Sequence, residues 1–90
     1  MNALTTLPNI GKTVAAKLNA IGINNEHELK EIGSEQAIIK IATIENSEAC
    51  INMLYAIEGA IQGIRWHGLS KERKYELNQF YRMMVKNQTT

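Results

Sequence analysis

The chain has 90 residues, of which 44% are hydrophobic, and a formal net charge of +1. This length and composition are those of one globular domain, residues 1–90, with a modest core. The single cysteine, Cys50, excludes a disulfide-rich fold. The near-neutral charge excludes a protein that is basic over its whole surface, so a polyanion would have to bind a local patch.

The sequence carries no signal for membrane insertion or export. No segment approaches the roughly 18 apolar residues of a membrane span, and the first residues lack the basic and then apolar pattern of a signal peptide. An unpaired cysteine on an apolar helix fits a reducing compartment. We therefore expect a cytoplasmic location, no membrane contact, and a buried or half-buried Cys50 without a reactive role.

Local signals predict two short helices in the first third of the chain. The first runs from about Lys12 to Ala20 and ends before Gly22, a residue that suits the left-handed conformation. Its apolar face consists of Val14, Ala15, Leu18 and Ile21. The second helix follows Asn25, which is a good N-cap. Glu28, three residues later, can accept a hydrogen bond from the backbone of Asn25, as in a capping box. Leu29 and Ile32 are expected to face inward, and Gly33 is expected to end the helix.

Ser34 is predicted to cap a third helix that runs from Glu35 to Ile44. The β-branched residues of this segment would also suit a strand. The cap, the acidic Glu35 in the first turn and the lack of a partner strand elsewhere favour the helix. The expected buried residues are Ala37, Ile38 and Ile41.

Ser47 is predicted to cap the fourth and longest helix, from Glu48 to about Ile64. One stripe along this helix is apolar and consists of Ile51, Leu54, Ile57 or Glu58, Ile61 and Ile64. A second stripe consists of the small residues Ala56, Gly59, Ala60 and Gly63. Because glycine inside a helix costs about 1 kcal/mol relative to alanine, we expect another helix backbone to approach this stripe closely.

Gly68 interrupts the chain, and Ser70 is predicted to cap the last helix, from about Lys71 to Lys86. The inner face of this helix consists of Leu77, Phe80, Tyr81 and Met84. With short connections and no strand signal, the sequence predicts an all-α fold, a small single-domain bundle of about five helices.

Several segments together resemble a known family. LPNIGKTVAAKLNAIGI, residues 7–23, followed by ELKEIG, residues 28–33, resembles a helix–hairpin–helix unit, as found in many DNA repair and recombination proteins. With YAIEGAIQGIRW, residues 55–66, and the following HGLS, the chain resembles the C-terminal domain of TfoX/Sxy-type competence regulators from Leu7 to about Met84. This resemblance implies a helix–hairpin–helix or SAM-like fold and a DNA-associated or transcription-regulatory role linked to natural transformation. In that family the domain often follows an N-terminal domain of a different fold, which we expect this chain to lack.

The chain departs from the full hairpin unit at two places. Only six residues precede Leu7, so we expect the first helix of the unit to be absent or replaced by another element. The usual hairpin has the pattern Gly, apolar, Gly, and Asn9 stands here in the place of the first glycine. Because asparagine tolerates a positive φ better than most residues do, we expect the turn to survive, with Ile10 anchored inward.

The hairpin allows two interpretations. In the first, it binds a phosphate: Gly11 lets the backbone approach a ligand, and the amides of Gly11, Lys12 and Thr13 point outward at the positive end of a helix dipole. The residues of this candidate site are Asn9, Gly11, Lys12, Thr13 and Lys17. One such site gives weak, non-specific contact with a DNA backbone. In the second interpretation the segment is an ordinary helix start, because proline and glycine punctuate turns in any protein.

The densest basic run, RWHGLSKERK, surrounds two ring side chains, Trp66 and His67. Its cations are Arg65, Lys71, Arg73 and Lys74. In one interpretation these charges support contact with a nucleic-acid backbone or an acidic partner. In the other, Trp66 anchors the core between the last two helices and the charges form a solvated rim.

The sequence contains no arrangement typical of catalysis or metal binding. His27 and His67 lie far apart in sequence, aspartate is absent, and no histidine shares the helix of Cys50. We therefore expect a non-enzymatic protein without catalytic residues, metal or cofactor.

The leading hypothesis is a DNA-associated or transcription-regulatory module whose hairpin contacts the phosphate backbone non-specifically. The alternative is a protein–protein interaction or homodimerisation module that does not bind nucleic acid. Its partner would be a second copy or a separate regulatory protein. The contact surface would be the small-residue stripe or the methionine-rich segment RMMVK, residues 82–86.

Overall fold

The computed structural model describes residues 3–44 and 48–88 of the chain, and within these residues it contains helices and no strand. In chain order the elements are η1 (Ala3–Thr6), α1 (Lys12–Ala20), α2 (Glu26–Ile32), α3 (Ser34–Ala42), α4 (Ile51–Gln62), η2 (Trp66–Gly68) and α5 (Lys71–Gln88), where η denotes a 3-10 helix. The all-α prediction is therefore confirmed. None of the helices described is both long enough and apolar enough to cross a membrane.

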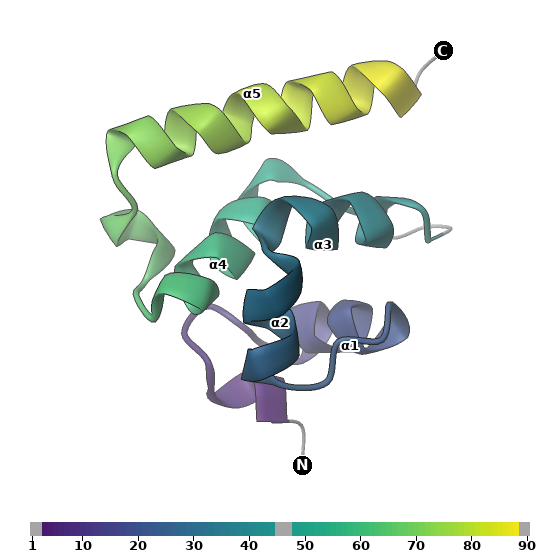
Figure 1. Ribbon diagram of the computed structural model, residues 1–90, viewed down its shortest axis with the longest axis vertical. Helices are drawn as coiled ribbons and strands as arrows, with labels where there is room; N and C mark the ends of the chain where they lie inside the picture. Colours follow the sequence, from purple (N-terminus) through teal and green to yellow (C-terminus); the bar gives the residue numbers. More distant parts are fainter. Residues whose placement is uncertain (1–2, 45–47, 89–90) are drawn as a thin grey trace.

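The helices form three levels, which are visible in Figure 1. α5 runs along one side of the molecule, α3 and α4 lie in the middle, and α1 and η1 lie on the other side. α4 packs against both α3 and α5, and α1 packs against α3. α1 and α5 are thus separated by the level that contains α3 and α4.

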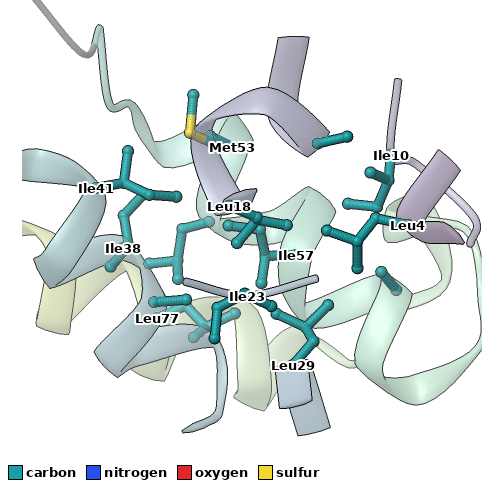
Figure 2. Close-up of a cluster of buried hydrophobic side chains, with 14 of the residues drawn as sticks. Leu4, Ile10, Leu18, Ile23, Leu29, Ile38, Ile41, Met53, Ile57 and Leu77 are labelled. Atoms are coloured by element: carbon teal, nitrogen blue, oxygen red, sulfur yellow. The ribbon is translucent and has the colours of Figure 1, made fainter. Parts of the chain in front are cut away.

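The core draws buried side chains from both sides of this middle level. Figure 2 shows Leu18 and Ile57 in the middle of the cluster, between Leu4 and Ile10 on one side and Ile38 and Ile41 on the other. Leu4 is fully buried although it belongs only to the short η1. η1 therefore supplies an apolar residue where the full hairpin unit would have its first helix, so another element does precede the hairpin, as expected.

Two predicted caps are confirmed. The backbone N–H of Glu28 donates to the side-chain oxygen of Asn25 at 2.9 Å, and the N–H of Arg73 donates to the hydroxyl of Ser70 at 3.0 Å. The carboxylate of Glu28 accepts from the backbone N–H of Asn24 at 2.7 Å, one residue earlier than in a standard capping box.

The prediction that Ser34 caps the third helix is wrong. Gly33, with φ of +84°, occupies the N-cap position, and Ser34 is already the first residue of α3. The hydroxyl of Ser34 is buried and donates to the carboxylate of Glu58 at 2.6 Å. A tertiary partner on α4 therefore recruits this hydroxyl, and α3 ends at Ala42, two residues before the predicted end.

The predicted start and length of the fourth helix are also wrong. α4 begins at Ile51, with the half-buried Cys50 at its N-cap, because Glu48 has a positive φ of 57° that an α-helix does not allow. The predicted cap, Ser47, lies outside the described residues. The helix ends at Gln62, where Gly63 takes the left-handed conformation, so α5 with 18 residues is longer than α4 with 12.

Candidate functional site

The hairpin between η1 and α1 has the conformation that the sequence predicts. Asn9 adopts φ of +70°, the left-handed value expected of a residue in the place of the first glycine. Ile10 is only 5% exposed and lies in the core cluster (Figure 2), so it anchors the loop inward. The turn therefore survives the replacement of glycine by asparagine.

The side chain of Asn9 ties the hairpin to a distant part of the chain. Its amide nitrogen donates to the backbone oxygens of Ile64 at 2.9 Å and Ala56 at 3.4 Å. Its oxygen accepts from the backbone N–H of Trp66 at 3.1 Å. Asn9 is thus bonded within the protein and holds the hairpin against the end of α4 and the start of η2.

Gly59 on α4 provides the room for this contact. A Cβ atom at Gly59 would lie 2.5 Å from the side-chain nitrogen of Asn9 and 2.8 Å from the backbone oxygen of Ile64. The small residue is therefore needed for the hairpin side chain and the loop after α4. The predicted close approach of another helix backbone occurs at Gly59, where the same Cβ atom would lie 3.1 Å from the Cα of Trp66, the first residue of η2. Gly63 is the C-cap of α4 rather than part of its interior.

The start of α1 is open to solvent. Gly11, Lys12 and Thr13 are all exposed, no side chain caps the helix, and its first turn contains no acidic residue. Gly11 has an extended conformation, with φ of −96° and ψ of −173°, which any residue can adopt. A Cβ atom at Gly11 would have no neighbour within 4 Å. The fold therefore does not require a glycine here, and a ligand can approach the backbone.

An open hollow of about 460 Å³ runs along the exposed side of α1. Its lining residues are Lys12, Thr13, Ala16, Lys17, Ala20 and Ile44. Lys12, Thr13 and Lys17 from the predicted site thus share one surface, with alanine and isoleucine side chains between them. This surface has the charge and hydroxyl group that suit a phosphate and apolar groups that suit the sugar beside it.

The start of the basic run lies beside the turn of the hairpin. The turn of the hairpin, η2 and the start of α5 follow one another along the left edge of the molecule in Figure 1. Arg65 is exposed and lies between Ile64 and Trp66, whose backbone atoms both bond to Asn9. Arg65 is therefore held beside the hairpin, whereas Lys71 and Lys74 lie at the start of α5.

The charge of Arg73 is engaged within the protein. Its guanidinium group pairs with the carboxylates of Glu35 at 3.0 Å, Glu58 at 3.1 Å and Glu76 at 3.2 Å. The hydrogen bond to Glu58 is the main cause that raises the pKa of the Arg73 guanidinium. A phosphate would have to displace these partners, so the structure gives Arg73 a role in joining α5 to α3 and α4.

The carboxylate of Glu58 is the polar centre of this joint, and little in the sequence predicts that role. Glu58 is 7% exposed and accepts hydrogen bonds from Ser34 and Arg73, and from the side chain of Gln62 at 2.7 Å. Burial alone would raise the pKa of this carboxyl group, but the hydrogen bonds outweigh burial and lower the pKa below its ordinary value. The available signal was a single carboxylate within an otherwise apolar helix stripe.

Trp66 lies half-buried against the core, between α4 and α5. Its ring stacks on Tyr55 of α4 at 6.0 Å and on His67 at 3.9 Å between ring centroids. The ammonium group of Lys74 lies 5.6 Å from the centre of the Trp66 ring and 3.5 Å from the backbone oxygen of His67. The core-anchor interpretation thus describes Trp66, while His67 remains exposed.

No group of three or more histidine, cysteine or glutamate side chains that could hold a metal ion occurs among residues 3–44 and 48–88. The exposed His27 lies 3.7 Å from the carboxylate of Glu31 on the same helix.

Comparison with known proteins agrees with this architecture. The family model of the TfoX C-terminal domain matches residues 1–81. The crystal structure, in a triclinic form, of an uncharacterized protein from Listeria monocytogenes is 45% identical with a TM-score of 0.87, and the match covers 91% of this chain and 92% of that chain. A tetragonal crystal structure of a protein of unknown function from Listeria monocytogenes is also 45% identical, with a TM-score of 0.84 and coverage of 89% and 98%. No curated protein matches the chain. The match over nearly the whole sequence shows that the chain belongs to the TfoX C-terminal domain family.

Proposed function

We propose that this domain is a non-enzymatic, DNA-associated module of a regulatory kind, which contacts the phosphate backbone non-specifically through its hairpin. Membership of the TfoX C-terminal domain family supports a regulatory role, for which the resemblance to competence regulators suggests transcription as the setting. A cytoplasmic location fits this role and the unpaired Cys50.

The observation that carries the proposal is the open approach to Gly11. The fold requires no glycine at this position, yet the residue stands at the uncapped start of α1, between the fixed Asn9 and the exposed Lys12. A phosphate oxygen placed here would meet the amides at the positive end of the helix dipole. The Thr13 hydroxyl and the Lys12 and Lys17 ammonium groups would add a hydrogen bond and charge.

The affinity expected from this site is low. A charge at a helix N-terminus gains about 0.3–1 kcal/mol, and each neutralised phosphate adds about 0.9 to the slope of log affinity against log salt. Binding through one or two phosphates therefore needs low salt to be measured, and it carries no base specificity. This agrees with the net charge of only +1.

A titration of a fluorescently labelled DNA duplex at low salt tests the proposal. We expect Lys12→Glu and Gly11→Val to weaken binding several-fold, because the first reverses a charge and the second places a branched side chain where the phosphate must approach. Arg82→Glu is the matched control, since Arg82 is exposed on α5, on the opposite side of the molecule from α1 (Figure 1). A parent protein that does not bind contradicts DNA association, and binding unchanged by both hairpin substitutions contradicts the role of the hairpin.

The second candidate function is homodimerisation, and one observation favours it. A hollow of about 330 Å³ between α3 and α5 is lined by Ile39, Thr43, Phe80, Met83, Met84 and Asn87. Met83 at its rim is 59% exposed, which is unusual for a large apolar side chain. The small-residue stripe no longer serves this hypothesis, because Gly59 and Ala60 are buried inside the domain.

A further inference from the structure

The ring stack at η2 ends in an exposed side chain. One face of the His67 ring lies against Trp66, with 3.9 Å between the centroids and 29° between the planes. His67 is nevertheless an exposed residue. Trp66 in turn stacks on Tyr55 with an angle of 14°, which connects the exposed ring to the body of α4.

The backbone around this stack is fixed from several directions. The backbone N–H of Gly68 donates to the backbone oxygen of Arg65, and the N–H of Leu69 donates to that of Trp66. These two bonds close the single turn of η2. Leu69 is buried, and the N–H of Trp66 donates to the side chain of Asn9. The position of the His67 ring is thus set by the fold before any ligand arrives, which limits the entropy lost on binding.

The charges around the ring are mostly positive. Lys74 lies against Trp66 and the backbone of His67, Arg65 immediately precedes the stack, and Lys71 is exposed at the first position of α5. The acidic groups nearby on α5 are Glu72, which is exposed, and Glu76, which pairs with Arg73. The surface therefore combines a flat ring with the Lys74 ammonium group beside it, and the exposed Arg65 and Lys71 lie close to His67 along the chain.

We propose that the His67 ring is a stacking platform for an unpaired nucleobase, so that the domain prefers single-stranded nucleic acid to an intact duplex. In a duplex both faces of each internal base are covered by its neighbours, whereas an unpaired base offers a free face to a ring. An aromatic ring can stack on any base, so this contact does not select a nucleotide sequence. The cations would bind the phosphates on either side of the stacked base. The inference rests on the proposed function, which assigns nucleic acid as the ligand. In this arrangement the hairpin binds phosphates of the same strand.

The direct test compares an oligothymidine of about ten nucleotides with an abasic strand of equal length, which keeps the phosphates and lacks the bases. We expect the oligothymidine to bind at least about fivefold more tightly, the lower end of what one stacked base contributes. Trp66 is the only tryptophan of the chain, so quenching of its fluorescence reports occupation next to the stack. His67→Ala should reduce the affinity for oligothymidine to that for the abasic strand, and His67→Tyr should restore the difference.

His27→Ala is the matched control, because His27 is the other histidine of the chain and is exposed on α2. Equal binding of oligothymidine and abasic strand by the parent protein, or unchanged preference in His67→Ala, overturns the platform. Duplex binding that depends on Lys12 would then still support the hairpin. Conversely, binding that responds to His67 and ignores Lys12 overturns the hairpin and supports the platform, and a protein that binds no strand overturns both.

Discussion

The side chain of Asn9 combines two properties that no other common residue joins in the same way. It accepts the left-handed φ of the turn, as glycine would, and it makes hydrogen bonds to residues 56, 64 and 66, which glycine cannot. The turn and the loop after α4 are therefore fixed by one residue. Gly59 completes this arrangement by leaving space for the amide group.

Replacing Asn9 separates the two properties. Asn9→Gly keeps the backbone freedom but leaves the N–H of Trp66 and the oxygen of Ile64 without their partner, so we expect a loss of about 1–3 kcal/mol in the free energy of unfolding. Asn9→Ala also loses the favourable conformation, which adds about 1–2 kcal/mol. Urea unfolding followed by circular dichroism measures both values. If Asn9→Gly is as stable as the parent, these hydrogen bonds contribute nothing.

Secondary-structure elements that depend on local signals were predicted well, and those that depend on distant partners were not. α1 has its predicted bounds, and Asn25 and Ser70 cap α2 and α5, because each cap bonds within three residues of itself. Ser34 failed as a cap because its partner, Glu58, lies 24 residues away. No local pattern predicts whether such a hydroxyl will bond to a nearby backbone N–H or to a distant side chain.

The same distinction applies to the candidate site. The positive φ of Asn9 and the inward position of Ile10 followed from the residue types and the hairpin pattern. The bonds of the Asn9 side chain join positions up to 57 residues apart, and the pairing of Arg73 joins α5 to two other helices. Only the tertiary arrangement decides that the polar groups of Asn9 and Arg73 bond within the protein while Lys12 stays exposed.

The joint of α3, α4 and α5 should make stability depend on pH. Because hydrogen bonds lower the pKa of Glu58 in the folded state, the folded protein binds fewer protons there than the unfolded chain does. Its contribution is complete above the ordinary glutamate pKa of about 4.3 and is lost as the pH falls through the lowered pKa of the folded state.

We expect Glu58→Gln to be less stable than the parent at neutral pH and to show a weaker loss of stability in acid. Urea midpoints measured between about pH 7 and pH 3 give both quantities. Glu72→Gln serves as the control, because Glu72 is exposed in the first turn of α5. If Glu58→Gln loses as much stability between about pH 7 and pH 3 as the parent does, the carboxylate of Glu58 does not stabilise the packing of these helices.

At the scale of the whole molecule, the candidate functions rest on different side chains, and this allows them to be tested independently. The hairpin, η2 and the start of α5 share one edge, whereas the hollow with Met83 lies between α3 and the later part of α5. Substitutions at one surface therefore leave the other in place, because no buried core residue is changed.

If the domain forms homodimers through the hollow, Met83→Lys should shift the protein toward monomer, because it places a charge in an apolar contact. Sedimentation velocity over a range of concentrations measures this shift. Tyr75→Lys is the matched control, since Tyr75 is 66% exposed on α5 and does not line the hollow. A parent protein that sediments as a monomer at every concentration rules out dimerisation through this surface.

The position of η1 decides how the protein can be trimmed or tagged. Leu4 fills part of the core, and the backbone N–H of Leu7 donates to its oxygen at 3.1 Å, so the first turn of chain supports the hairpin directly. Deletion through Thr6 would open a void beneath the hairpin and release the loop that carries Asn9. An affinity label is better fused after α5, which lies on the side of the molecule opposite η1 (Figure 1).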